Sequence, residues 1–167
     1  MKKSILLLTI LFLAVKVSFA QEQHHHEKAE YDKLDVQLEL LMDTAAKHMI
    51  MFILTQKEEE YNTSMATIKQ ADSLYQSIVK LVATHKGNHK QIEQDELADT
   101  KEEFAPYKDT KLKQMILGET AKQRTEKVKF HGKSYTVSSK SKQKLEVFEE
   151  FLPRNKNYLT ISLNYFC

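Results

Sequence analysis

Histidines are the residues of this sequence with the clearest chemical potential, and three of the seven are adjacent. His24, His25 and His26 are followed by the acidic residues Glu27 and Glu30. Neutral imidazoles are the commonest protein ligands for metals, and a histidine run is typical of metal binding. The favoured interpretation is a solvated, flexible terminal arm with no cofactor. The alternative is a divalent-metal site, with zinc or copper held by His24, His25, His26 and Glu30.

A second pair of histidines lies further along the chain. His85 and His89 are four positions apart, which is a ligand spacing on a continuous helix. Gly87 and Asn88 lie between them and favour a turn. The sequence therefore predicts that both histidines lie in a loop, with metal binding as the alternative.

Basic side chains gather in residues 122–144, where eight lysines and arginines stand against Glu126 alone. Such a cluster makes a positive field that attracts surfaces rich in phosphate or carboxylate groups. The alternative is a solvated surface that complements the acidic residues 21–104, which carry 17 acidic and 9 basic side chains. The predicted binding patch consists of Lys122, Arg124, Lys127, Lys129, Phe130, Lys133, Tyr135, Lys140, Lys142 and Lys144.

Signals for catalysis are poor. The chain has only three glycines, and no phosphate-cradling loop is present. Ser77 and Ser139 each begin an S-x-x-K match, but the companion motifs of that enzyme class are missing. The single cysteine, Cys167, is the last residue and excludes an intramolecular disulfide. We therefore expect a non-enzymatic protein with no catalytic residue.

The first twenty residues have the pattern of a secretory signal peptide. Lys2 and Lys3 precede an apolar run from Ile5 to Val15, and Ser18-Phe19-Ala20 is a small-x-small cleavage site. The run is shorter than the roughly 20 residues that a membrane-spanning helix needs. We expect an exported protein, periplasmic or extracellular, with no transmembrane span after cleavage. Export argues against nucleic acid and favours an acidic protein or an anionic envelope surface as partner, and it leaves a homo-oligomer open.

Residues 31–52 contain a repeating pattern of mostly apolar side chains, which predicts a stripe along one face of a helix. The first row of this stripe repeats every seven residues and consists of Tyr31, Leu38, Ala45 and Phe52. A second row with the same spacing consists of Leu34, Leu41 and His48. That spacing places the side chains on one helical face that must pack against a partner. His48 is expected at the edge of the bundle with a hydrogen-bond partner.

The apolar rows change phase near Thr55, where Thr55-Gln56-Lys57-Glu58 fits a capping box. This favours two antiparallel helices, at about 28–54 and 57–85, over one long bent helix. The run from Met49 to Leu54 is apolar on every side. It is expected to be the best-buried part of the bundle, with a surface patch for a partner as the alternative.

The second half of the chain is more varied. Residues 91–103 read as a weak acidic helix or a partly disordered segment, and residues 111–117 as a short helix that Gly118 ends. Val128 to Val137 alternate around His131-Gly132, which predicts a β-hairpin. A helix capped by Ser139 or Ser141 and a strand from Leu159 to Tyr165 complete the pattern.

The sequence predicts a mainly α fold: a helical hairpin or bundle followed by a small C-terminal α+β module with a short hairpin, a helix and a final strand. The predicted parts are a signal peptide (1–20), a histidine-rich flexible arm (21–27), the helical hairpin or bundle (28–104) and the basic α+β module (105–167). The expected function is a binding or structural role, with divalent-metal binding as the alternative.

Overall fold

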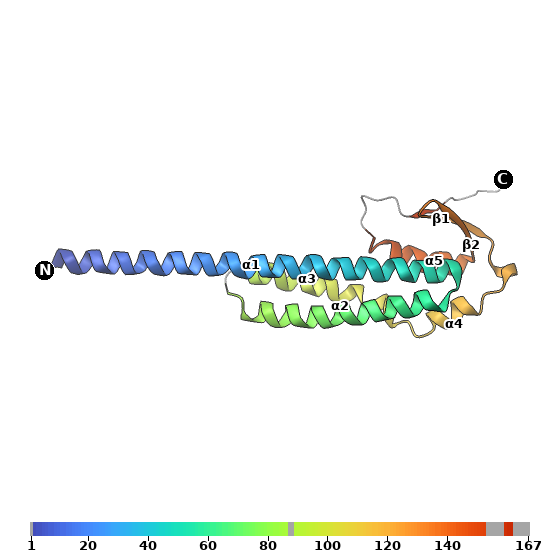
Figure 1. The fold of residues 1–167 in the computed structure, drawn as a ribbon, viewed down its shortest axis with the longest axis horizontal. Coiled ribbons are helices and arrows are strands. Elements are labelled where there is room, and N and C mark those ends of the chain that lie inside the picture. Colours follow the sequence, from blue (N-terminus) through green and yellow to red (C-terminus); the bar gives the residue numbers. More distant parts are fainter. Residues whose placement is uncertain (1, 87–88, 153–158, 162–167) are drawn as a thin grey trace.

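The computed structural model describes the backbone of residues 2–86, 89–152 and 159–161, and the side chains of residues 27–86 and 89–152. The fold is mainly helical with a small α+β module at its C-terminal end, which confirms the predicted class (Figure 1). The helices are α1 (Lys2–Thr55), α2 (Glu58–Thr84), α3 (His89–Glu103), α4 (Leu112–Leu117) and α5 (Ser139–Glu149), with short 3-10 turns at Ala105–Lys108 and Ala121–Gln123. The strands are β1 (Glu126–Phe130), β2 (Lys133–Val137) and β3 (Leu159–Ile161).

Helices α1 and α2 form the predicted antiparallel hairpin rather than one long helix (Figure 1). The chain reverses at Gln56, which adopts a positive φ of 59°. The predicted capping box is wrong, because Thr55 is still the last residue of α1 and its hydroxyl donates to the Met51 carbonyl oxygen at 2.6 Å. The N-cap of α2 is instead Lys57, which makes no side-chain capping bond.

The core lies around the C-terminal end of α1. The first row of the stripe, from Tyr31 to Phe52, is buried, while the second row is half-buried. His48 lies at the edge as expected, with Nδ1 2.7 Å from Glu60 Oε2. Every residue from Met49 to Leu54 is buried except Met51, which is half-buried. Figure 1 shows why: α2 covers one side of this segment, and α5 with the sheet covers the other. The alternative of a surface patch for a partner at Met49–Leu54 is therefore wrong.

The acidic segment forms helix α3, and the partly disordered alternative does not hold. Its apolar content is small, and Leu97 is its only buried apolar side chain. Ile92 is 60% exposed. Few apolar contacts therefore hold α3 to the hairpin.

The α+β module has the predicted order of elements. Strands β1 and β2 pair antiparallel around His131 and Gly132, whose φ angles of 48° and 75° suit a tight hairpin turn. Strand β3 pairs with the other edge of β1, so the sheet order is β2-β1-β3. Helix α5 is capped by Ser138, which accepts from the Ser141 backbone N–H at 3.0 Å, and not by Ser139 or Ser141 as predicted.

The short helix and the last strand also follow the prediction where the structure describes them. Helix α4 ends with Gly118 as its C-cap. The 3-10 turn that begins after Thr120 has a capping box, in which the Thr120 N–H donates to Gln123 Oε1 at 2.8 Å. The predicted continuation of the final strand beyond residue 161 lies outside the described residues.

The N-terminal part of α1 projects beyond the ends of α2 and α3 (Figure 1). This helix includes the predicted signal peptide and residues 21–27, for which the sequence predicted a flexible arm. Among the described residues, no helix is both long enough and apolar enough to cross a membrane.

Candidate metal centre

Two helix ends bring the second histidine pair together. Helix α2 stops at Thr84, and His85 turns the backbone out of the helix with a ψ of 154°. Helix α3 starts at His89, so Glu93 follows one turn later on the same helical face. The Lys90 ammonium group donates to the Ala83 carbonyl oxygen at 2.9 Å and ties the start of α3 to the end of α2.

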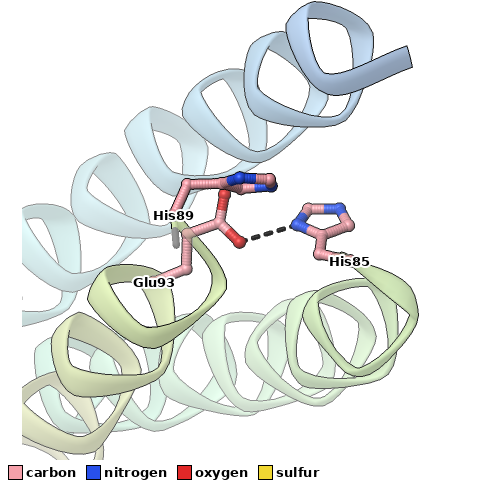
Figure 2. Close-up of side chains that lie close together, drawn as sticks. All are labelled: His85, His89 and Glu93. Atoms are coloured by element: carbon pink, nitrogen blue, oxygen red, sulfur yellow. Dashed lines mark hydrogen bonds and ion pairs between the residues drawn. The ribbon is translucent and has the colours of Figure 1, made fainter. Parts of the chain in front are cut away.

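The side chains of His85, His89 and Glu93 form a compact cluster. Figure 2 shows the Glu93 carboxyl group reaching between the two imidazole rings. His85 Nδ1 lies 2.6 Å from Glu93 Oε2, and these side chains are only 0% and 5% exposed. One nitrogen or oxygen atom from each of the three residues lies within 4.8 Å of the others.

The buried pair has unused hydrogen-bonding capacity. His85 Nε2 and Glu93 Oε1 are buried and have no hydrogen-bond partner among the described residues. When His85 Nδ1–H donates to Glu93, Nε2 carries a lone pair, and Glu93 Oε1 carries further lone pairs. A buried polar atom without a partner costs about 1–3 kcal/mol. The two ring nitrogens of His85 point in different directions, so a metal ion shared with Glu93 and His89 would bind His85 at Nδ1 and move the ring proton to Nε2.

A fourth donor comes from a different helix. Glu27, on α1, places its Oε2 atom 3.8 Å from His89 Nε2. The Glu27 and His89 side chains are 18% and 22% exposed, so this side of the cluster is the one nearer to solvent. Donors from α1, from the end of α2 and from α3 therefore meet at one corner of the bundle.

The surroundings of the cluster carry negative charge. The Tyr31 hydroxyl donates to Glu96 Oε2 at 2.8 Å. Burial, this hydrogen bond and nearby carboxylates, Glu93 among them, hold the pKa of Tyr31 far above its usual value. Further along α1 and α3, a cavity of about 280 Å³ is lined by Asp35, Leu38, Glu39, Met42, Glu96, Asp99, Thr100 and Glu103. A region of one charge sign raises the local concentration of counter-ions, here cations.

Carboxylate crowding in this cavity is visible in the pKa values. Burial, followed by the charges of Glu39 and Glu96, raises the pKa of Asp35. Burial, followed by the charges of Glu39 and Asp99, raises the pKa of Glu103. The carboxylates of α1 and α3 therefore repel one another across the cavity.

Two imidazoles and one or two carboxylates suit zinc, which binds His nitrogen and carboxylate oxygen at about 2.0–2.2 Å in tetrahedral geometry. Neighbouring ligand atoms are then about 3.4 Å apart, so His85 Nδ1 and Glu93 Oε2, which lie 2.6 Å apart, need to separate by about 0.8 Å to hold the ion. Copper and nickel also accept imidazole ligands. The burial of His85 and Glu93 favours a structural site over one that exchanges substrates.

The two histidine groups singled out in the sequence, His24–His26 and the pair His85 and His89, have different outcomes in the structure. The side chains of His24, His25 and His26 lie outside the described residues, and Glu30 is exposed on α1. The predicted turn falls on residues 87 and 88, outside the described residues. The prediction that both histidines lie in a loop is wrong for His89, which begins α3, and the two rings have a centroid distance of 5.6 Å. Glu93 was not among the predicted ligands. The i, i+4 spacing of His89 and Glu93 would have indicated it, had the helix been placed from residue 89 rather than 91.

The basic patch is only partly available as a surface. Arg124 donates to the carbonyl oxygens of Ile53 and Leu54, and Phe130 is buried on the inner face of the sheet. Two more lysines form ion pairs with acidic residues, Lys142 with Glu126 and Lys144 with Asp109. Tyr135 is half-buried. The exposed members of the predicted patch are Lys122, Lys127, Lys129, Lys133 and Lys140.

Comparison with protein-family models, curated proteins and solved structures finds no match for this chain.

Proposed function

We propose that this protein binds a divalent transition-metal ion, with zinc as the best fit, through His85, His89 and Glu93. The observation that carries the proposal is the convergence of the three ligand atoms within 4.8 Å of one another. Two of these side chains are almost completely buried, and each retains an atom without a hydrogen-bond partner in the described part of the chain. The role is that of a metal-binding or metal-stabilised protein and not of an enzyme.

Isothermal titration of zinc and of copper into the purified protein tests the proposal. We expect one ion per chain, and we expect His89→Gln and Glu93→Gln each to weaken binding by at least about tenfold, because each removes a ligand. The matched control is His48→Gln, since His48 also pairs with a glutamate, Glu60, at 2.7 Å but has no third donor among the residues that the structure describes.

Replacing His24, His25 and His26 by alanine separates the two candidate sites. Affinity that is kept in this variant and lost in Glu93→Gln supports the centre at the α2–α3 connection. Affinity lost with the three histidines, and kept in Glu93→Gln, would assign the ion to the N-terminal run. Binding no tighter than millimolar in the unmodified protein would leave His85 and Glu93 as a hydrogen-bonded link between two helices.

The exposed basic face of the hairpin supports a second function, binding to an anionic envelope surface or an acidic protein. Lys127 and Lys129 alternate with the buried Val128 and Phe130, so both lysines point outward from β1. Lipid vesicles with anionic head groups should bind the protein, and changing Lys127, Lys129 and Lys133 to glutamine should weaken that binding. The control changes Lys57, Lys69 and Lys80, which are exposed on α2 or just before it, to glutamine. Equal effects of the two triple variants would show that the net charge of the protein, and not the hairpin face, attracts it to the vesicles.

We also propose that the protein is exported and that its first twenty residues are removed, because they have the pattern of a secretory signal peptide. Mass spectrometry of the protein isolated from its native cell should find Gln21 as the first residue, in the periplasm or the medium. A chain that keeps Met1 would contradict the cleavage.

A further inference from the structure

Helix α3 has little buried apolar surface. Glu93 and Leu97 are its only buried side chains. Two tyrosine hydroxyls add polar contacts, because Tyr75 donates to the Leu97 carbonyl oxygen at 3.1 Å and Tyr31 donates to Glu96 at 2.8 Å. Segments with few buried apolar contacts open locally at a small free-energy cost.

The charges along α3 oppose its docking. Glu96, Asp99 and Glu103 line the cavity that α3 shares with α1, and α1 contributes Asp35 and Glu39 to the same lining. Among the described residues, no basic side chain lines that cavity. Five carboxylates in one groove repel one another wherever they are ionised.

The cluster of His85, His89 and Glu93 lies at the N-terminal end of the same helix. His89 and Glu93 belong to the first turns of α3, His85 ends α2, and Glu27 belongs to α1. Glu27 Oε2 is 3.8 Å from His89 Nε2, which is close to the separation of about 3.4 Å between neighbouring ligand atoms of a tetrahedral zinc ion. A single ion at this corner would be bonded to three helices at once.

We propose that Glu27 is the fourth ligand of the metal centre and that the ion works as a cross-link, which docks α3 onto α1 and α2 against the repulsion of the groove. This inference depends on the proposed metal site. The ion contributes two positive charges to an acidic corner, and each opening of α3 that separates His89 and Glu93 from Glu27 breaks metal–ligand bonds. The loaded protein keeps α3 docked, and the metal-free protein opens it often.

Hydrogen exchange of the backbone amides, with and without zinc, measures this docking. If opening of α3 requires loss of the ion, exchange through that opening slows by a factor of 1 + [Zn]/Kd, which is about 100-fold at a zinc concentration of 100 times Kd. We expect this slowing for amides of α3 from residue 93 to 103. Amides in the middle of α2 and in the β1–β2 hairpin should change little.

The fourth ligand is tested by Glu27→Gln, with Asp32→Asn as the matched control. Asp32 lies five residues further along α1 and is exposed, so both variants lose one acidic charge from the same stretch of helix. Glu27→Gln should weaken zinc binding by about tenfold or more and reduce the zinc-dependent protection of α3 at a fixed zinc concentration. Asp32→Asn should leave both unchanged.

The outcomes separate this inference from the proposed function. Zinc binding that depends on His89 and Glu93, combined with unchanged exchange of α3, would overturn the cross-link and leave the metal site in place. Unchanged affinity in Glu27→Gln would remove Glu27 from the ligand set and would also overturn it. Absence of zinc binding in the unmodified protein would end both proposals.

Discussion

Arg124 fastens the C-terminal end of α1 to the α+β module, and its replacement by methionine should destabilise the protein. Its Nη2 atom lies 2.8 Å from the Ile53 carbonyl oxygen and 3.2 Å from that of Leu54. These belong to the last four carbonyl groups of α1, which have no partner within the helix. Its Nε atom lies 3.8 Å from Glu119 Oε2, with the two side chains 14% and 7% exposed.

The magnitude follows from these contacts. Hydrogen bonds of a charged donor contribute about 1.5–3 kcal/mol each, and removing one partner of a buried ion pair costs about 3–5 kcal/mol. The two terms overlap, because one mutation causes both, and some water reaches Arg124. We therefore expect Arg124→Met, which keeps most of the apolar stem, to lower the free energy of unfolding by about 3 kcal/mol. For a chain of this size the melting temperature should fall by about 6–12 °C.

Urea unfolding followed by circular dichroism measures this loss. Lys129→Met is the matched control, because Lys129 is exposed on the outer face of β1 and its loss should cost no more than about 0.5 kcal/mol. Adding Glu119→Gln to Arg124→Met removes the buried charge left behind and should recover about 1 kcal/mol. A loss below about 1 kcal/mol in Arg124→Met would refute the role given to this side chain.

Three further predictions concern stability. Tyr107→Phe should raise the free energy of unfolding by about 1 kcal/mol, because the Tyr107 hydroxyl is buried without a hydrogen-bond partner in the described part of the chain; a destabilised variant would reveal a partner. Glu103→Gln should stabilise the protein at neutral pH, since burial and neighbouring carboxylates raise the pKa of Glu103 above its usual 4.5. The folded state binds the proton of the Glu103 carboxyl group more tightly than the unfolded state does. Ionised Glu103 therefore destabilises the folded state as the pH rises above 4.5, and this effect is complete above the raised pKa. Thermal melts in which Glu103→Gln gains equal stability at neutral pH and well below 4.5 would contradict this sign. Gly132→Ala should cost about 1 kcal/mol in urea unfolding, since the turn holds Gly132 at a φ of 75° and no atom lies within 4 Å of an added Cβ; an unchanged stability would show that the turn relaxes.

The elements with a clear hydrophobic period could be predicted from the sequence. Seven-residue rows located α1, and their change of phase located the turn near Thr55, because both patterns are local. The details of helix ends were less predictable. Thr55 has the residue type of an N-cap, but Gln56 takes the left-handed conformation and leaves Thr55 inside α1. Ser138, Ser139 and Ser141 differ little in sequence, and only the path of the chain decides that Ser138 caps α5.

The candidate site could be predicted only in part, since it depends on how helices lie in space. The sequence offered His85 and His89 as metal ligands, although a turn between them was the favoured interpretation. The cluster does not need the two histidines on one helix, because α3 lies against α2 and carries Glu93 to His85. The proximity of Glu27 to His89 joins residues more than sixty positions apart, and no local pattern contains it.

Helix α1 has neighbours from both halves of the chain at its C-terminal end, where α2 lies on one side and α5 with β2 on the other. A fragment that stops at residue 104 would therefore leave part of the apolar Met49–Leu54 segment in water, and a fragment that starts at residue 105 would lack the surface that Leu145 and Phe148 of α5 need. The chain should melt as one cooperative unit with a single calorimetric transition, even though its charge and pattern divide it into two.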